Sequence, residues 1–305
     1  MKRQAILAAI FLSVLASGSV LAQEPQGLSV TPEEFEAKLG YQHGTVELGS
    51  GMAAINVPES MRFIGPEGSR RLLTEAWGNP PELAVGVLGM LIPAEVSPLA
   101  PEGWGVIITY DEDGYVEDDD AASIDYGKML KELQEATLAA NPEREKAGYP
   151  PMRLVGWAEP PSYDAVAHKL YWAKELASGD EPEHTLNYNI RILGRRGVLV
   201  LNAVARMEEL GVIRDRSQEM LAAVEFKEGH RYAEYLPGTD KAATYGITGL
   251  IAGAAAAKAG LFKLLWVGIL AFKKLIIVGV VALGSMLKPL FSRWRKPASA
   301  ASAQP

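Results

Sequence analysis

An acidic loop near the middle of the chain carries the residues best suited to bind a metal ion. Its carboxylates alternate around a glycine: Asp111 and Asp113 precede Gly114, and Glu117 and Asp120 follow it. Calcium takes about six to eight oxygen ligands, and Asp and Glu side chains are its usual donors of oxygen. The spacing therefore predicts a Ca²⁺ site formed by Asp111, Asp113, Glu117 and Asp120.

This loop matches the helix–loop–helix calcium motif only in part. With Asp111 at the third position and Asp113 at the fifth, Gly114 falls at the sixth, where the motif requires glycine. The first position, however, is Thr109, and the twelfth is Asp120 instead of the expected Glu. The alternative interpretation is structural, because Asp-Gly is a strong turn dipeptide and a helix dipole favours acidic residues near its N-terminus.

No arrangement of residues in the sequence predicts a catalytic centre. The four histidines lack the spacing of a zinc site, and there is no cysteine. A G-x-S-x-G nucleophile elbow, a phosphate-binding loop and a dinucleotide-binding glycine motif are all missing from the sequence. We therefore assign no catalytic residue and no cofactor other than Ca²⁺, and we expect His168 to pack on a strand face beside Trp172. The histidines are His43, His168, His184 and His230.

Two further groups of residues have both a functional and a structural interpretation. Arg195 and Arg196, in a turn between two glycines, predict either contact with a phosphate or lipid headgroup or a solvated hairpin tip. Trp157, Tyr171 and Trp172 belong to neighbouring predicted strands, where they either pack in the sheet or line a ligand groove. We favour the structural interpretation for both groups.

Charge is distributed unevenly along the chain. Of the 30 Lys and Arg residues, two precede residue 23 and nine follow residue 240, whereas all 37 Asp and Glu residues lie between these positions. The region 23–240 therefore has 19 basic residues against 37 acidic ones. Because a strongly acidic domain repels nucleic acid and anionic lipid headgroups, we expect no nucleic-acid partner.

The N-terminal residues 1–22 have the three-part pattern of a secretory signal peptide. Two basic residues precede an apolar run over residues 5–16, and the small-residue cleavage site Val20-Leu21-Ala22 follows this run. The alternative is an uncleaved N-terminal anchor. Export would place the next domain where disulfides form, but without cysteine its stability has to come from an apolar core.

Residues 241–291 predict a membrane anchor of one or two helices. They are apolar, contain no acidic residue and precede a basic cluster that leads into a disordered tail over residues 292–305. We favour one full crossing with an adjacent interfacial helix over a hairpin of two crossings. In the hairpin, Lys273 and Lys274 would lie inside the bilayer, or the basic cluster would lie outside the cell.

The region 23–240 predicts one exported domain that contains both helices and strands. Thr31, Pro32 and Glu34 have the pattern of a helix start with a capping box. An apolar stripe predicts a second helix over residues 125–140, which Asn141 and Pro142 end. Strands are predicted over residues 153–161, 165–176, 184–193 and 198–207.

The strand at residues 184–193 has the clearest alternation. Its apolar face is formed by Leu186, Tyr188, Ile190 and Ile192, and its polar face by Thr185, Asn187, Asn189 and Arg191. Such alternation is typical of a half-buried antiparallel strand with one face in water. Because strands and helices come in clusters, we predict an α+β fold with a mostly antiparallel sheet flanked by helices, followed by a C-terminal transmembrane helical region.

Four long stretches of the sequence resemble one bacterial family. Residues 103–126, 148–176, 186–207 and 240–262 are similar to the membrane-anchored family catalogued as domain of unknown function 2167. The resemblance covers nearly the whole chain after residue 22 and implies a membrane-anchored bacterial protein, but it supplies no activity, cofactor or catalytic residue. The order of predicted elements is also similar, more weakly, to the Mog1/PsbP-like α/β/α sandwich, and a fold alone does not set function.

Together these observations predict a protein of the bacterial inner membrane with its soluble domain on the periplasmic or extracytoplasmic side. Its expected partners are the lipid bilayer and another membrane or envelope protein. The leading hypothesis is a non-enzymatic interaction module. The alternatives are an envelope hydrolase with a dispersed Asp, Glu and His site, and an accessory subunit of a membrane transporter. An enzyme needs at least two titratable groups with perturbed pKa values in one concave site.

Overall fold

The computed structural model describes residues 31–146 and 148–253 of the chain. The predicted signal peptide, the basic and disordered tail and most of the predicted anchor lie outside these residues. Among the residues that are described, no helix has both the length and the apolar character needed to cross a bilayer.

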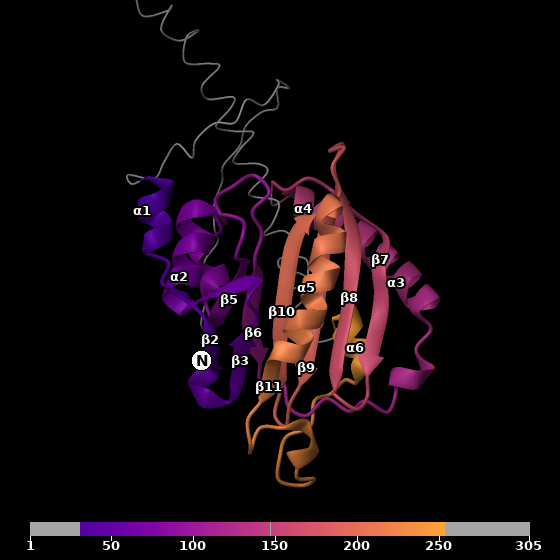
Figure 1. Ribbon diagram of the computed structural model, residues 1–305. Helices are drawn as coiled ribbons and strands as arrows, with labels where there is room; N and C mark the ends of the chain where they lie inside the picture. The colour runs from indigo at the N-terminus through magenta and orange to yellow at the C-terminus, as the bar shows by residue number, and fades with distance from the viewer. Residues whose placement is uncertain (1–30, 147, 254–305) are drawn as a thin grey trace, which may run out of the picture.

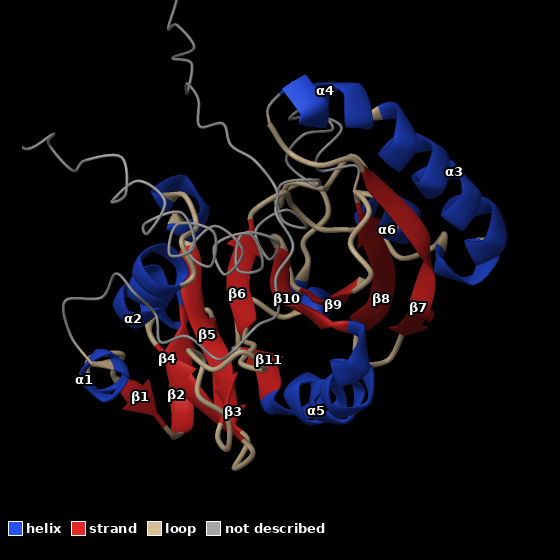
Figure 2. Ribbon diagram, turned by 90° about the horizontal axis from the view of Figure 1, so that it is seen from above, coloured by secondary structure: helices blue, strands red, loops and turns tan. Residues whose placement is uncertain are grey.

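The largest element of the fold is an eight-stranded sheet in which every neighbouring pair of strands is antiparallel (Figures 1 and 2). Its strand order is β1-β4-β5-β6-β10-β9-β8-β7. The predicted α+β class with an antiparallel sheet is therefore confirmed. The strands are β1 (Tyr41–Gln42), β4 (Met61–Ile64), β5 (Val87–Pro93), β6 (Val106–Asp111), β7 (Met152–Asp164), β8 (Lys169–Ser178), β9 (Thr185–Leu193) and β10 (Val198–Arg206).

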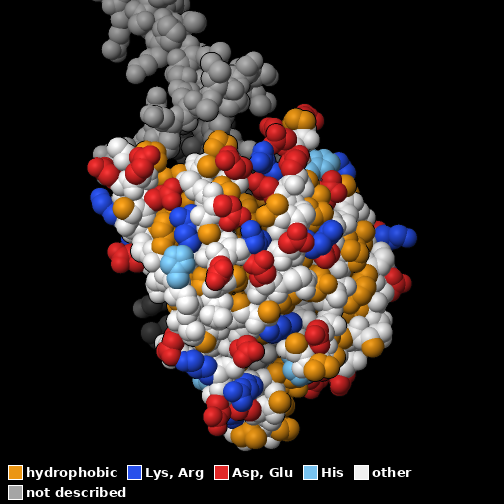
Figure 3. All heavy atoms as spheres, in the orientation of Figure 1, with side chains coloured by type: hydrophobic (Ala, Val, Ile, Leu, Met, Phe, Trp, Pro, Cys, Tyr) orange, Lys and Arg blue, Asp and Glu red, His pale blue; other side chains and the backbone are white. Residues whose placement is uncertain are grey.

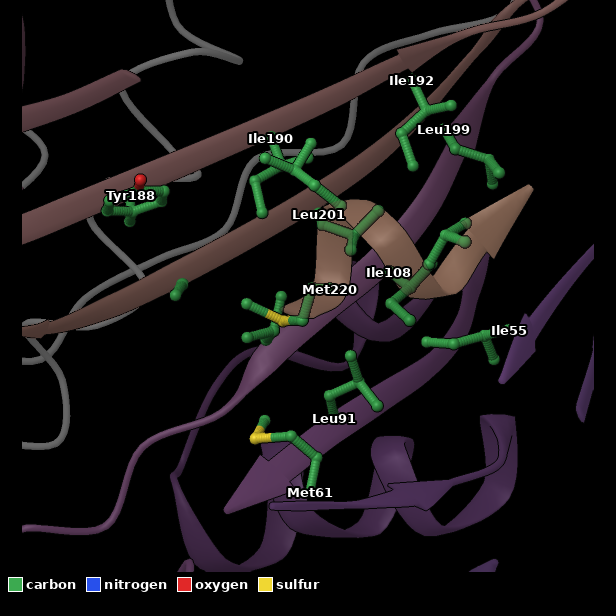
Figure 4. Close-up of a cluster of buried hydrophobic side chains, with 14 of the residues drawn as sticks. Ile55, Met61, Leu91, Ile108, Tyr188, Ile190, Ile192, Leu199, Leu201 and Met220 are labelled. Carbon is green, nitrogen blue, oxygen red and sulfur yellow. The ribbon is translucent and has the colours of Figure 1, made fainter. Parts of the chain in front are cut away.

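One face of this sheet holds the main apolar core. It packs against helix α5 (Leu210–Ala223) and against a three-stranded antiparallel sheet of β11 (Val224–Phe226), β3 (Ala53–Val57) and β2 (Gly44–Leu48). Ile190, Leu201, Ile55 and Met220 come from four different elements and meet in this core (Figure 4). Burial of each such side chain contributes roughly 1.5–3 kcal/mol.

The opposite face is covered by two separate groups of helices (Figure 2). Helix α1 (Pro32–Ala37) and helix α2 (Pro66–Arg71), which continues as a π-helix (Leu72–Ala76), pack on β4 and β5. Helices α3 (Tyr126–Ala139) and α6 (Ile247–Ala252) pack on the other end of the sheet, over β7, β8 and β10. The remainder of β10, together with β6 and β9, runs between the two helical groups.

Several local predictions are confirmed, and two need correction. The capping box of Thr31 and Glu34 forms, and the second predicted helix is α3. Asn141 and Pro142 do end α3, but they also begin a new helix, α4 (Asn141–Lys146), because proline is tolerated in a first turn. Strand β8 begins at Lys169, since residues 165–168 form the turn that joins it to β7.

The prediction that β9 has one face in water is wrong. The apolar face lies in the main core as expected. On the polar face, however, the exposed fractions of Thr185, Asn187 and Asn189 are only 4%, 8% and 5%. These three side chains are therefore largely shielded from water, while Arg191 is partly exposed, and shielded polar groups need hydrogen-bond partners.

Candidate functional site

The residues predicted to bind Ca²⁺ lie in the acidic loop, residues 111–120, which follows β6. Asp113 accepts a hydrogen bond from the hydroxyl of Tyr245 at 2.6 Å. Asp120 accepts two, from the backbone N–H groups of Ile247 and Thr248, both at 2.9 Å. Over residues 31–146 and 148–253, no group of three or more Asp, Glu or His side chains is arranged to hold a metal ion. Ca²⁺ binding by Asp111, Asp113, Glu117 and Asp120 remains a prediction.

What the acidic loop does hold is the 240–248 segment, which includes the first residues of the predicted anchor over residues 241–291. Tyr115 forms a parallel bridge with Ala242, with hydrogen bonds of 2.9 Å to the carbonyl of Lys241 and 2.7 Å from the N–H of Ala243. Gly114 has a φ of +109°, and a Cβ atom there would lie 2.6 Å from the carbonyl oxygen of Lys241. The loop needs glycine at this position so that the two backbones can approach each other.

Asp120 caps the N-terminus of α6 from a distant segment, because its carboxylate accepts from the first two N–H groups of the helix, whose own N-cap residue is Gly246. Partial burial acts to raise the pKa of Asp120, but the hydrogen bonds from the Thr248 side chain and from the backbone of Thr248 and Ile247 outweigh it, and the pKa lies below its usual value. α6 in turn contributes Ile247, Leu250 and Ile251 to a second apolar core, which lies on the face of the sheet opposite the main core. The described part of the chain after residue 240 is thus packed into the domain.

The hairpin of Arg195 and Arg196 also binds the 240–248 segment. Asp240 accepts hydrogen bonds from Arg195 Nε at 2.6 Å and from Arg196 Nε at 3.3 Å. The hydrogen bond from Arg195, helped by those from Leu236 and Arg196, lowers the pKa of Asp240 to about 2. The hairpin is therefore an intramolecular clamp. The side chain of Arg195 is 14% exposed and is not the solvated tip that was expected, whereas that of Arg196 is 50% exposed and remains partly solvated.

His168 lies in the turn before β8 and not on a strand face beside Trp172. Its φ is +52°, and its ring stacks on that of Tyr232 at 4.0 Å between centroids. The Tyr163 hydroxyl lies 3.2 Å from His168 Nδ1 and donates to Asp118 at 2.7 Å. Burial and the bond to Asp118 raise the pKa of Tyr163, which makes its hydroxyl a poorer nucleophile.

A second polar group lies on the sheet face between the two helical groups, and we call it the sheet-face donor cluster. Cross-strand register brings its members together from three adjacent strands. Trp172 of β8 is opposite Asn189 of β9, which is in turn opposite Asn202 of β10, and Lys174 is opposite Asn187. The cluster comprises Trp172, Lys174, Asn187, Asn189, Arg191 and Asn202.

Hydrogen bonds inside this cluster use its side-chain oxygens. Arg191 donates to Asn189 Oδ1 at 3.3 Å, Asn189 donates to Asn187 Oδ1 at 2.8 Å, and Asn187 donates to Asn202 Oδ1 at 3.0 Å. All three amide oxygens are thus acceptors in one relay. The groups left over are donors, because Lys and Trp side chains have no acceptor.

Two of these donors lack a partner. Trp172 is 2% exposed, and its indole N–H is buried without a hydrogen-bond acceptor in residues 31–146 and 148–253. Lys174 donates no hydrogen bond and forms no ion pair within the part of the chain that the structure describes. An unmet buried donor costs about 1–3 kcal/mol.

The two cations of the cluster are both partly buried. Burial, with a smaller effect of Arg191, lowers the pKa of Lys174 to about 8. Burial also lowers the pKa of Arg191 to about 10, and the negative charge of Asp111 offsets part of that shift. The guanidinium of Arg191 lies 5.0 Å from the centroid of the Trp172 ring. Such shifts concentrate at binding and catalytic sites.

Sequence reasoning missed this cluster because its signal was interpreted as a solvent-exposed face. Asn187, Asn189 and Arg191 recur at every second position, which is also the pattern of a strand that faces water. Of the aromatic residues considered, Trp172 packs in the second core, and the indole N–H of Trp157 donates to the carbonyl of Tyr126 at 3.2 Å. Trp172 alone combines packing with an unmet N–H.

Comparison with known proteins gives a family and several solved structures. The model of the family described as "Protein of unknown function (DUF2167)" matches residues 40–284. No curated protein matches the chain.

The chain is similar to three solved structures whose TM-scores are too low for the likeness to carry an argument about function. The cyanobacterial PsbP of Synechocystis sp. PCC 6803 is 9% identical with a TM-score of 0.34, over 62% of this chain and 94% of that one. The Ran-binding protein Mog1p of Saccharomyces cerevisiae is 13% identical with a TM-score of 0.31, over 61% and 96%. LpqN of Mycobacterium tuberculosis, involved in cell envelope biogenesis, is 15% identical with a TM-score of 0.30, over 64% and 95%.

Proposed function

The chain belongs to the DUF2167 family of proteins of unknown function, and we propose that its described domain is a non-enzymatic interaction module of the bacterial envelope. The module is exported, tethered to the inner membrane by the predicted anchor, and binds another envelope protein on its extracytoplasmic side. Its binding surface is the sheet face that carries the donor cluster.

The observation that carries this proposal is the excess of donors on that face. Trp172 and Lys174 have polar groups without partners among the described residues, although the rest of the cluster is joined by hydrogen bonds. Buried polar groups in stable proteins are normally paired, so an unpaired set indicates a place where another molecule supplies the acceptor. By contrast, on the face seen in Figure 3 basic and acidic side chains are interspersed, without a patch of one sign.

The rival hypothesis of an envelope hydrolase has one observation in its favour. Asp118, Tyr163 and His168 come from separate segments and meet, with 3.5 Å between His168 Nδ1 and Asp118 Oδ2. The hydroxyl that bridges them belongs to Tyr163, whose pKa is raised, whereas nucleophilic catalysis requires an activated hydroxyl. The lysines on which a transporter subunit would depend, Lys258, Lys263, Lys273 and Lys274, lie outside the described residues.

Site-specific photocrosslinking on membranes tests which face of the domain binds. A photoreactive amino acid replaces Val204, which is on the same face of β10 as Asn202, in the full-length chain. The matched control replaces Val212, which is 50% exposed. Val212 belongs to α5, the helix that covers the opposite face of the sheet. We expect a discrete adduct of one mass from position 204 and none from position 212.

Equal adducts from both positions, or an adduct from position 212 alone, would contradict the assignment of the binding face. The tether is tested separately by extraction of membranes with alkaline carbonate. The full-length chain should stay with the vesicles, and its release would remove the membrane part of the proposal.

A further inference from the structure

The charge of the donor cluster points to the chemistry of what it binds. Lys174 and Arg191 are two partly buried cations, and both hydrogen bonds that Arg191 donates within the described residues go to neutral oxygens, those of Ile190 and Asn189. A buried charge requires a counter-charge or dense hydrogen bonding. The cluster is therefore suited to bind a negatively charged group, and the proposed function does not specify the chemical class of that group.

We propose that Lys174, Arg191 and Trp172 together bind a carboxylate group of an acidic peptide segment in the partner protein, an inference that rests on the proposed function. Each contributes a different kind of donor. Lys174 provides a mobile ammonium, Trp172 a single fixed N–H, and Arg191 the N–H groups that it does not donate to Ile190 and Asn189.

The chain itself has little to offer as the counter-ion. Helix α6, which ends at Ala252, lies beside the cluster. Its residues Leu250 and Ile251 share an apolar core with Trp172. The sequence after Ala252 contains no Asp or Glu and therefore supplies no acidic side chain. The negative charge of Asp111 acts to raise the pKa of Arg191, but burial outweighs it, so the pKa remains below its ordinary value.

A carboxylate fits the cluster better than a phosphate. Protein phosphate sites usually add backbone N–H groups, from helix N-termini or glycine-rich loops, to their basic side chains. β8 and β9 both lie inside the sheet, with a partner strand on either side, so their backbone N–H groups are used in the ladders. Side-chain donors alone, with one guanidinium, match the two oxygens of a carboxylate.

Protection of Lys174 from an amine-reactive ester tests the proposal. The full-length chain in lipid nanodiscs is labelled near pH 8 at constant ionic strength, and the rate at Lys174 is read by peptide mass spectrometry. Glutarate is the carboxylate probe and inorganic phosphate the comparison. We expect glutarate to slow labelling of Lys174 by about fivefold or more, phosphate to slow it less, and neither to protect the exposed Lys128 on α3.

Three variants separate binding from folding. Arg191→Gln should remove the protection by glutarate, and Trp172→Phe, which keeps a packed ring but loses the N–H, should weaken it. Arg191→Lys should restore part of it. An unchanged labelling rate at Lys128 in each variant shows that the domain is folded around α3.

Three outcomes would overturn the inference. They are an absence of protection by either anion, equal or better protection by phosphate, and protection that survives Arg191→Gln. None of these results affects the photocrosslink from position 204. If that adduct forms while glutarate fails, the binding face stands and only the carboxylate is wrong.

Discussion

The acidic loop and the sheet-face donor cluster differ in how their polar groups are matched. Asp113 and Asp120 in the loop are conspicuous in the sequence, yet both accept hydrogen bonds from Tyr245, Ile247 and Thr248 of the same chain. The donor cluster is inconspicuous in the sequence, yet its Lys174 and Trp172 have donors that meet no acceptor within the part of the chain that the structure describes. The difference teaches that the density of charged residues in a sequence does not indicate which groups are available to a ligand.

The two regions also differ in what their polar groups do for stability. In the loop, hydrogen bonds join parts of the chain 127 residues apart and therefore hold the fold together. In the cluster, unmatched donors and buried cations lower the stability of the free protein. Groups that cost stability persist where binding needs them, which is why their removal should strengthen the fold.

Gly114→Ala gives the largest expected effect, because it separates the loop from the segment it holds. The new Cβ would meet backbone atoms of Lys241, Ala242 and Ala243 at 2.6–2.9 Å, at a φ that disfavours any side chain. We expect a loss of about 2–4 kcal/mol in the free energy of unfolding, measured by denaturant titration.

The matched control is Gly211→Ala in α5, where no atom lies within 4 Å of the new Cβ. This change should leave stability unchanged or raise it by about 0.5–1 kcal/mol. A loss below about 1 kcal/mol for Gly114→Ala would show that the loop does not hold the 240–248 segment tightly.

In contrast to Gly114→Ala, Lys174→Met should stabilise the domain by about 1–3 kcal/mol at pH 7, because it removes a partly buried cation that has no partner among the described residues. Lys128→Met is the control, since Lys128 is exposed and should change stability by about 0.5 kcal/mol or less. If Lys174→Met destabilises the domain, the lysine has a partner after all.

The difference in stability between the unmodified protein and Lys174→Met should depend on pH. The pKa of Lys174 falls from its ordinary 10.5 to about 8 in the folded protein. Between these values the unfolded chain keeps the proton that the folded protein has lost, so the stability of the unmodified protein rises with pH. The advantage of Lys174→Met should shrink steadily above pH 8, and an advantage that stays constant to pH 10 would contradict the assigned shift.

Asp120→Ala should have a smaller effect, a loss of about 1 kcal/mol, because it removes the cap of α6. Hydrogen exchange at the amides of Ile247 and Thr248 should accelerate. Asp119→Ala is the neighbouring control, with an exposed side chain, and should change neither quantity. Since the pKa of Asp120 is lowered, its contribution is present above its ordinary pKa of 3.8 and is lost as the pH falls through the folded value.

The Ca²⁺ hypothesis carries the smallest expected effect. Any ion would compete with the hydrogen bonds that Asp113 and Asp120 already accept. A site with a dissociation constant near 1 mM would add only about 0.4 kcal/mol at 1 mM Ca²⁺, or roughly 1–2 °C in melting temperature. Calorimetry of the full-length chain with Ca²⁺ decides the matter. The absence of both heat and a melting shift would remove the site.

The sequence alone determined the local features of this protein. The capping box at Thr31, the helix α3 and the turn between Gly194 and Gly197 all formed as predicted. The apolar face of β9 lies in the core for the same reason. Each of these depends on periodicity or on residues within about four positions of one another, which a sequence displays directly.

Only the tertiary structure decided which polar groups are matched. Asp120 and Ile247 are 127 residues apart, and Asp113 and Tyr245 are 132 residues apart, so no local pattern shows that they meet. The burial of Thr185, Asn187 and Asn189 on the polar face of β9 depends on what packs over that side of the sheet, which alternation along one strand does not show. Whether a charged side chain is spent within the fold or left for a ligand depends on contacts between distant segments, and those exist only once the chain has folded.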